Sequence, residues 1–316
     1  YLVTGAAGFI GSHMVETILE QGDSVVAFDN LEHGTLDNLT FTEEAAKQGQ
    51  YTFIKGDIRT LEDCHKACEG VDYVLHQAAL GSVPRSMEEP LLYHTNNGTG
   101  TLNMLIAARD AGVKRFCFAS SSSVYGDTVQ LPKVETITPT PKSPYAISKL
   151  MGEHYCKMFN ESYGLETVAF RYFNVFGSRQ DPNSQYAAVI PAFLTKYLAN
   201  ESPVIHGDGE QTRDFTYVKN VVALNLKACF APKEACGRVY NVGCGSRISV
   251  NRLAESIKVS AGATVDPIYT DSRAGDVRDS LASMELAKKY LAPEAFVTLE
   301  EGMVPTANWY KANFLP

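Results

Sequence analysis

The feature that most constrains the fold is a glycine-rich turn near the start of the chain, between a predicted strand and a predicted helix. Residues 1–4 have strand character, and Gly5, Gly8 and Gly11 follow at intervals of three residues. Glycines in such a turn let backbone N–H groups at a helix N-terminus approach a phosphate closely. A glycine-rich turn without a ligand is the alternative. The flanking strand and helix favour a dinucleotide site, which would also include Phe9 and Ile10.

Apolar, β-branched runs alternate with amphipathic stretches through the first half of the chain. Strands are predicted at 1–4, 24–29, 51–57, 71–77, 115–121 and 166–173, and helices at 11–21, 61–69, 91–111 and 145–161. This rhythm predicts an α/β protein with a Rossmann-type, doubly wound parallel sheet. After residue 173 the alternation of strand and helix patterns becomes irregular. We therefore expect a nucleotide-binding domain over 1–175 and a smaller mixed α/β substrate domain over 176–316, with segments such as 218–231 packing back on the first.

Composition and charge argue against several other classes of protein. A net charge of −8 with scattered basic residues argues against binding to nucleic acid or to an anionic membrane surface. No apolar run approaches the length of a membrane-spanning helix, and the first residues do not resemble a signal peptide. Seven cysteines without a Cys-x-x-Cys pair predict a reduced, cytoplasmic protein without a metal site.

Three further strand ends carry side chains suited to a dinucleotide. Asp29 ends the second strand, where a carboxylate accepts hydrogen bonds from a ribose diol and repels a 2′-phosphate, so NAD is favoured over NADP. Asp57 and Ile58 close the third strand, where the carboxylate either meets the adenine amine or simply caps the next helix. The run His76, Gln77, Ala78 and Ala79 ends the fourth strand, where small residues would leave room for the cofactor.

A tyrosine and a lysine four residues apart form the candidate acid–base pair. Ser143 and Pro144 predict a helix start, because a capping hydroxyl precedes a ring whose fixed φ suits the first helical position. On that helix Tyr145 and Lys149 share one face about 6 Å apart, so we expect the ammonium to lower the phenol pKa from about 10. Tyr51 and Lys55 have the same spacing, but they lie in a strand-like run, where the two side chains are about 13 Å apart. They therefore cannot act as an acid–base pair.

Taken together, these motifs resemble those of the extended short-chain dehydrogenases/reductases, and specifically those of the UDP-hexose 4-epimerases. The resemblance runs over essentially the whole chain and implies a tightly bound NAD that serves as a catalyst. It rests on the glycine turn, Asp29, His76 to Ala79, the serine-rich strand end before Val124-Tyr125-Gly126, Tyr145-x-x-x-Lys149, Arg171-Tyr172-Phe173-Asn174 and Arg213-Asp214-Phe215. It also adds Asn30, Gly34, Asn97 and Tyr172 to the candidate cofactor-binding residues.

The resemblance implies roles for three catalytic residues. Tyr145 would remove the proton from the sugar 4-hydroxyl, Lys149 would hold the nicotinamide ribose, and Ser121 would orient the hydroxyl or relay its proton. Counting back from Val124 selects Ser121, but the serine run 120–123 leaves that choice uncertain by one residue. These serines could instead satisfy only local backbone groups.

The resemblance further implies a UDP-sugar substrate. Arg213 and Arg273 would neutralise its diphosphate, because planar guanidinium groups suit phosphate, although either could form a surface ion pair instead. The other expected contacts are Asn174 with the diphosphate or uridine, Asp276 with the uridine ribose, and Ala188 and Val189 with the uracil.

One position is expected to decide which sugar is accepted. In the family's pattern the residue four positions after Asp276 gates the sugar pocket, and here it is Ser280. A tyrosine there restricts the pocket to plain hexoses, whereas a small residue leaves room for an N-acetyl group at C2. The resemblance therefore implies UDP-N-acetylglucosamine and its galacto epimer as preferred substrates, with UDP-glucose and UDP-galactose also accepted. The run from Gly81 to Ser86 and Gln180 match the subgroup with this preference, and Ser82, Ser122 and Gln180 could supply the polar contacts that an acetamido group needs.

Other functions and the oligomeric state remain open from the sequence. A nucleotide-sugar 4,6-dehydratase needs Asp-Glu after the catalytic Ser/Thr, where this chain has Ser122 and Ser123. A non-catalytic NAD(H)-sensing protein commonly lacks the tyrosine–lysine pair. A UDP-glucuronate 4-epimerase or decarboxylase needs only an arginine for the sugar carboxylate. The helices at 91–111 and 145–161 resemble those that form a four-helix bundle in a family homodimer, although the same faces could pack on the sheet.

Overall fold

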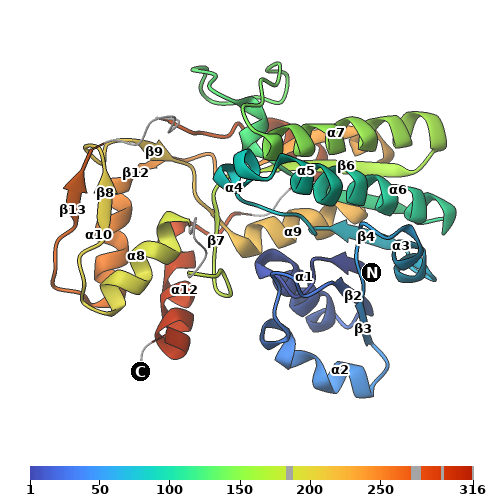
Figure 1. Cartoon of the computed structure of the whole chain (residues 1–316), viewed down its shortest axis with the longest axis horizontal. Helices are drawn as coiled ribbons and strands as arrows, with labels where there is room; N and C mark the ends of the chain where they lie inside the picture. Colours follow the sequence, from blue (N-terminus) through green and yellow to red (C-terminus); the bar gives the residue numbers. More distant parts are fainter. Residues whose placement is uncertain (183–187, 272–278, 293–294, 315–316) are drawn as a thin grey trace.

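The computed structural model describes residues 1–182, 188–271, 279–292 and 295–314. They form a larger part built around one central sheet and a smaller part of helices and short strands beside it (Figure 1). No helix in these ranges is long and apolar enough to cross a membrane. Within the same ranges, no group of three or more His, Cys, Asp or Glu side chains could hold a metal ion.

The central sheet has seven parallel strands in the order β11-β6-β5-β4-β1-β2-β3. The strand order reverses between β1 and β4, and open α/β sheets bind ligands at the carboxyl ends of the strands beside such a point. The predicted doubly wound parallel sheet is therefore confirmed. Its strands are β1 (Leu2–Thr4), β2 (Val25–Asp29), β3 (Tyr51–Lys55), β4 (Tyr73–His76), β5 (Arg115–Ser121), β6 (Glu166–Tyr172) and β11 (Arg238–Val242).

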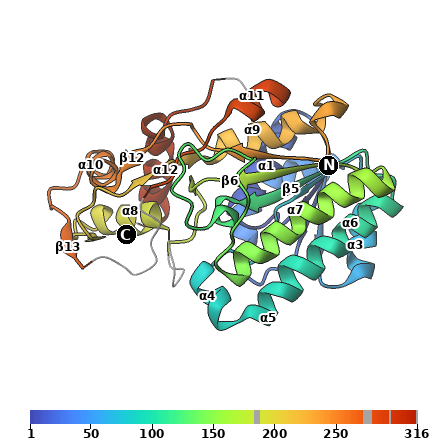
Figure 2. The same cartoon turned by 90° about the horizontal axis from the view of Figure 1, so that it is seen from above.

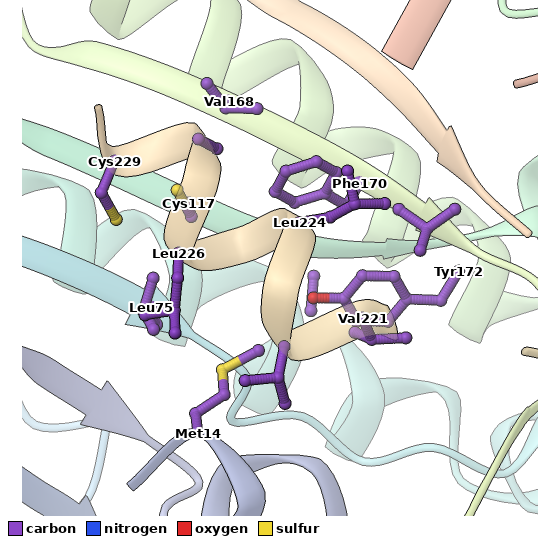
Figure 3. Close-up of a cluster of buried hydrophobic side chains, with 14 of the residues drawn as sticks. Met14, Leu75, Cys117, Val168, Phe170, Tyr172, Val221, Leu224, Leu226 and Cys229 are labelled. Atoms are coloured by element: carbon purple, nitrogen blue, oxygen red, sulfur yellow. The ribbon is translucent and has the colours of Figure 1, made fainter. Parts of the chain in front are cut away.

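Helices cover both faces of the sheet because successive strand residues point to opposite sides. Phe116 and Phe118 of β5 pack with one helical layer, whereas Cys117 packs with the other. The first layer contains α3 (Leu61–Cys68), α6 (Gly100–Asp110) and α7 (Pro144–Tyr163), which lie side by side in Figure 2. The second contains α1 (Phe9–Glu20) and α9 (Val218–Cys229). Figure 3 shows α9 placing Val221, Leu224 and Leu226 against the sheet.

Helix α7 starts and stops where its sequence provides the signals. Ser143 caps it by accepting a hydrogen bond from the N–H of Ala146 at 3.2 Å, and Pro144 occupies the first turn. Gly164 ends it in the left-handed conformation, with φ of 73°. The first turn of α7, which carries Tyr145, is therefore firmly placed at the end of β5.

The predicted strands and helices lie within two residues of the observed ones, with one exception. The single helix predicted over 91–111 is divided into α5 (Pro90–Tyr93), a π-helical turn η2 (His94–Thr99) and α6. The π-helical turn packs closely on α7, since a Cβ on Gly98 would lie 2.1 Å from Cε of Met151. This packing partner is far away in the sequence, so the local pattern gave no sign of the wider turn.

The second half of the chain contributes to both parts of the structure. Strand β11 joins the central sheet beside β6, and α9 and α11 (Glu285–Leu291) also pack on the larger part. The smaller part is built around α8 (Val189–Leu198), α10 (Val250–Ala261) and α12 (Leu299–Phe314), which share one apolar core. The remaining elements are α2 (Glu43–Lys47), α4 (Val83–Glu88), β7 (Val175–Phe176), β8 (Val204–His206), β9 (Thr212–Arg213), β10 (Thr216–Tyr217), β12 (Ile248–Ser249), β13 (Ile268–Thr270) and the 3-10 turns η1 (Leu36–Thr42), η3 (Ser122–Tyr125) and η4 (Lys233–Ala235).

Candidate active site

A cleft of about 370 Å³ lies at the carboxyl ends of β1 to β4, at the point where the strand order reverses. Its position matches the ligand site expected for a doubly wound sheet. The predicted residues in its walls are Gly5, Gly8, Phe9, Ile10, Gly11, Asp29, Asn30, Gly34, Ile58, Gln77, Ala78, Ala79 and Gly81. The sequence reasoning missed Phe28, Glu32, His33, Gly56, Leu80 and Asn96, which also line it. Asn96 lies in the π-helical turn η2, and the others are loop and strand-end residues without a motif of their own.

The glycine turn is built so tightly that side chains are excluded from it. Gly5 has φ of 64°, and a Cβ there would lie 2.9 Å from the backbone of Ala78. A Cβ on Gly11 would lie 2.1 Å from the carbonyl oxygen of Gly5. No side chain caps α1, whose N-terminus begins after Gly8 in the cleft wall. The first N–H groups of α1 and the positive end of its dipole thus face the cleft, as a pyrophosphate requires.

The carboxylates at the ends of β2 and β3 have different surroundings. Asp29 accepts hydrogen bonds from the N–H groups of Ala7, at 3.0 Å, and Leu31, at 2.8 Å. Burial raises its pKa, and these two bonds work against that rise. Asp57 lies just outside the cleft lining and is bound by Arg59 and by Nδ2 of Asn30 at 3.0 Å. Although burial acts in the opposite direction, these bonds lower the Asp57 pKa to about 2.

The end of β4 is held by a buried histidine. Nδ1 of His76 lies 2.7 Å from Oγ1 of Thr4, which in turn accepts the N–H of Ala78 at 3.1 Å. Burial, together with the charge of Lys149, lowers the His76 pKa to about 3, so the ring is neutral. His76 therefore fixes the wall of the cleft as an uncharged ring.

Gln77 presents an unused hydrogen-bond donor next to the cleft. Its Oε1 accepts the hydroxyl of Tyr172 at 3.1 Å, whereas its buried Nε2 has no partner in the part of the chain that the structure describes. Tyr172, a candidate cofactor residue, lies outside the cleft lining, and its hydroxyl also accepts a bond from Asn225 at 2.9 Å. Tyr172 thus orients Gln77.

Asn97 supports the cleft from behind, although the sequence placed it among the cofactor contacts. Its Oδ1 accepts the N–H of Leu80 at 2.8 Å, and its Nδ2 donates to the carbonyl of Leu80 and to Oγ of Ser148, both at 3.1 Å. These bonds use its amide, and it is 2% exposed. The neighbouring Asn96 lines the cleft instead.

Ser121, Tyr145 and Lys149 come together where β5 ends and α7 begins. The hydroxyl of Ser121 is hydrogen-bonded to the phenol of Tyr145. Burial raises the Tyr145 pKa, and the bond with Ser121 lowers it. Nζ of Lys149 donates to the carbonyl of Ala119 at 2.7 Å and lies 5.9 Å from the Tyr145 ring centre. Burial lowers the Lys149 pKa to about 7.

The expectation that Lys149 lowers the Tyr145 pKa therefore needs correction. The group that lowers it here is Ser121, and burial dominates the direction of the shift. The reason is that the ammonium is buried, weakly basic and committed to a backbone carbonyl.

The geometry also distinguishes between neighbouring serines. Oγ of Ser120 donates to Glu153 at 2.5 Å, and that carboxylate is held by Arg171 in a buried ion pair at 2.7 Å. Ser120 is therefore engaged by Glu153, about two turns further along α7 than Tyr145. Ser123 donates its hydroxyl and its N–H to Oγ of Ser121. Ser121 is thus the serine of this run that faces the phenol.

Several candidate substrate residues meet at the edge of the smaller part. Asn174, which has φ of 34°, donates from Nδ2 to the carbonyl of Asp214 at 2.8 Å and to Oγ of Ser280 at 3.3 Å. Arg213 lies next to Asp214, on β9. The Asp214 carboxylate accepts N–H groups of Cys244, Gly245 and Ala282, and burial nevertheless raises its pKa to about 6. Asp214 therefore ties Arg213 to the segment that carries Ser280.

The remaining substrate candidates are more scattered. Ser82 caps α4, and its N–H donates to the hydroxyl of Tyr93. The Oε1 of Gln180 is buried and has no partner in the described ranges. Ser122 begins η3, and Ala188 and Val189 form the N-terminus of α8, where no side chain caps the helix. Arg273 and Asp276 lie outside the described residues.

Comparison with known proteins identifies the family. Residues 1–243 match the model of the NAD dependent epimerase/dehydratase family. The chain is 41% identical to the structure of a UDP-N-acetylglucosamine 4-epimerase from Methanobrevibacter ruminantium M1 in complex with UDP-N-acetylmuramic acid, with a TM-score of 0.91 over 98% of this chain and 97% of that one. It is 37% identical to a UDP-glucose 4-epimerase from Thermotoga maritima with UDP-glucose, with a TM-score of 0.90 and 98% of each chain covered. A UDP-glucose 4-epimerase of Mycolicibacterium smegmatis is 36% identical over 312 residues, which cover 98% of both chains.

The chain belongs to the NAD dependent epimerase/dehydratase family, and it is an isomerase that uses NAD. The residues of the cleft fit this cofactor. The glycine turn gives the backbone approach that a pyrophosphate needs, and Asp29 keeps oxygen lone pairs for a ribose diol. The unused Nε2 of Gln77 adds a donor that a ligand in the cleft would satisfy.

Proposed function

We propose that this chain interconverts UDP-N-acetylglucosamine and UDP-N-acetylgalactosamine at C4, and that it also accepts UDP-glucose and UDP-galactose. The activity of a UDP-sugar 4-epimerase that uses NAD is supported by the family and by the named relatives. The proposed preference for N-acetylated sugars rests on Ser280, a small side chain beside Asn174 where a bulky residue would close the sugar pocket.

Tyr145 is proposed as the group that takes and returns the proton of the sugar 4-hydroxyl. When bound, NAD would supply the hydride chemistry at C4 of the sugar. The buried phenol of Tyr145 has a raised pKa, so once its phenolate has taken the proton it holds that proton strongly until it is returned. The bond from Ser121 lowers the cost of the phenolate and points the phenol toward the end of β5. The pair can therefore pass one proton to and fro without the help of solvent.

Lys149 is proposed to bind the nicotinamide ribose. Its ammonium lies beside Tyr145 and is held by the carbonyl of Ala119 at 2.7 Å. With a pKa near 7, it gains most from a ligand hydroxyl that accepts a hydrogen bond, since burial has removed its water. A ribose hydroxyl placed there would strengthen the positive charge next to the phenolate and favour proton removal.

The proposed N-acetyl pocket draws its polar groups from separate elements. Ser82 comes from the loop after β4, Ser122 from the end of β5, and Gln180 from the segment after β7, where its Oε1 is buried without a described partner. An acetamido N–H would satisfy that oxygen. The relative that is 41% identical and named as a UDP-N-acetylglucosamine 4-epimerase supports the same preference.

We also propose that two copies pair through α7 to form a homodimer with a four-helix bundle. Six residues of this helix line an apolar surface groove, and Ile147 within it is 54% exposed. An apolar face of this kind on one helix is typical of a protein interface. The groove residues are Ile147, Leu150, Met151, His154, Tyr155 and Met158.

All seven cysteines are free, which supports a reducing, cytoplasmic location.

The proposal is tested by incubating the purified protein with UDP-N-acetylglucosamine, UDP-glucose and UDP-glucuronate and identifying the products by NMR. We expect 4-epimers of the first two and a higher kcat/KM for the N-acetylated sugar. Tyr145→Phe should abolish turnover, while the NAD content, measured from the absorbance of nucleotide released on denaturation, stays the same. Formation of a 4-keto-6-deoxy sugar, or of a product from UDP-glucuronate alone, would contradict the proposal.

A further inference from the structure

The loop Leu80–Ser82 is hydrogen-bonded to the helical segment formed by α5 and η2, residues 90–99. The N–H of Ser82 donates to the hydroxyl of Tyr93 at 3.1 Å. Leu80 is held by both amide groups of Asn97, at 2.8 and 3.1 Å. Leu80 and Gly81 line the cofactor cleft, and Ser82 is a candidate contact of the sugar. The position of this loop therefore depends on Tyr93 and Asn97.

The same helical segment touches the catalytic helix at two points. The ring of Tyr93 meets that of Tyr145 edge-on, with ring centres 6.4 Å apart and an angle of 88° between the planes. Nδ2 of Asn97 donates to Oγ of Ser148, one turn further along α7, at 3.1 Å. Edge-to-face aromatic pairs prefer this separation and angle. One rigid segment thus contacts both the loop and the first turn of α7.

The π-helical turn η2 allows this double contact. It directly follows Tyr93, and Asn97 lies within it. Gly98 lets the turn approach Met151 of α7 so closely that a Cβ would lie 2.1 Å from Cε of Met151. π-Helical turns inside α-helices are rare and occur frequently at functional sites. Tyr93 is 1% exposed and Asn97 is 2% exposed, so few other positions are open to either side chain.

We propose that Tyr93 is a positioning residue that holds the loop Leu80–Ser82 at a fixed position relative to the phenol of Tyr145. Its ring sets the distance to the catalytic tyrosine, and its hydroxyl sets the position of Ser82. The inference rests on the proposed function, because it takes this loop as a wall of the sugar site. A loop that contacts the sugar equally before and during the reaction affects KM and leaves kcat nearly unchanged.

Tyr93→Phe tests the inference, since it removes the hydroxyl and keeps the ring. Hydrogen–deuterium exchange in a peptide covering residues 78–86 of the NAD-bound protein should become about 3- to 10-fold faster, because the Ser82 N–H loses its acceptor. KM for the sugar nucleotide should rise about 3- to 10-fold, with kcat and bound NAD within about 2-fold of the parent. A second variant, Tyr93→Leu, also removes the ring and should lower kcat.

Tyr240→Phe is the matched control, because it removes another buried tyrosine hydroxyl bonded to a backbone group, the carbonyl of Ala235, far from the cleft. It should leave KM and the exchange of residues 78–86 unchanged. Unchanged exchange in Tyr93→Phe would overturn the inference whatever the enzyme's substrate. Equal KM changes in Tyr93→Phe and Tyr240→Phe would also overturn it. A parent protein that turns over no UDP-sugar would instead overturn the proposed function. The exchange measurement would still test whether the Tyr93 hydroxyl holds the loop.

Discussion

Enlarging Ser280 should switch the enzyme from N-acetylated sugars to plain hexoses. Ser280 is 8% exposed, its hydroxyl accepts a bond from Asn174 at 3.3 Å, and its N–H donates to the carbonyl of Thr212 at 3.1 Å. The backbone at this position is therefore fixed, and we expect a larger side chain to extend into the proposed sugar pocket. In Ser280→Tyr the aromatic ring would occupy the space that we assign to the acetamido group.

The expected size of this effect follows from the cost of overpacking. Forcing extra atoms into a filled site costs about 1 to 3 kcal/mol, which corresponds to a factor of about 5 to 160 in kcat/KM. Only the N-acetylated sugar bears this cost, because UDP-glucose carries a hydroxyl at C2. The ratio of kcat/KM values for UDP-N-acetylglucosamine and UDP-glucose should therefore fall by that factor, with UDP-glucose itself changed by less than about 3-fold.

The assay measures both epimerisations by NMR or by a coupled enzyme, in the parent protein, in Ser280→Tyr and in Ser280→Ala. The alanine variant is the matched control, since it loses the same hydroxyl without filling the pocket, and it should keep the parent ratio. A tyrosine variant with an unchanged ratio would refute the gating argument. An equal loss on both sugars would refute it too, because the damage would then not depend on the acetamido group.

Three other substitutions probe separate parts of the account. Ser121→Ala removes the bond that lowers the Tyr145 pKa, so that pKa should rise and the acid limb of the kcat–pH profile should move up by about one to two pH units. Asp214→Asn places an amide NH₂ against backbone N–H groups and leaves at least one of them unpaired, so urea unfolding should show a loss of about 1 to 3 kcal/mol. Met151→Glu places a charge in the apolar groove of α7, and sedimentation at micromolar concentration should then show monomers.

Each of these has a control or an opposing result. If the acid limb of the kcat–pH profile of Ser121→Ala stays in place or moves to lower pH, the Ser121 hydroxyl does not lower the Tyr145 pKa. Asp266→Asn removes a carboxylate whose side chain is 86% exposed and should cost less than about 1 kcal/mol; a similar loss in both aspartate variants would argue against the buried network. Val259→Glu changes an exposed residue of α10 and should leave the dimer intact. If the parent protein is itself monomeric, the bundle proposal is wrong.

Local patterns were enough to predict the central sheet and the glycine turn. The strands of a doubly wound sheet are continuous apolar runs, and Gly5, Gly8 and Gly11 specify the turn by sterics that act within a few residues. β11 was not predicted, because its five residues include Arg238 and Asn241 and so do not form a continuous apolar run.

The site was predicted less completely because its details depend on distant packing. Asn96 and Asn97 are indistinguishable in the sequence, and only the π-helical turn against Met151 decides that Asn96 faces the cleft. In the same way Ser120 is withdrawn from the site by Glu153, which comes from α7. The direction of the Tyr145 pKa shift also needed the structure, since helical spacing indicates where Lys149 lies but not how deeply it is buried.

Epimerisation at C4 with return of the same hydride is tested most directly by incubating UDP-N-acetylglucosamine with the purified protein in D₂O and following the sugar by proton NMR. We expect UDP-N-acetylgalactosamine to form until both epimers are at equilibrium, and the hydrogen on C4 of the product to remain protium. That hydrogen is removed and returned inside the site, whereas the proton handled by Tyr145 is on oxygen. Deuterium at C4, or no 4-epimer at all, would contradict the account.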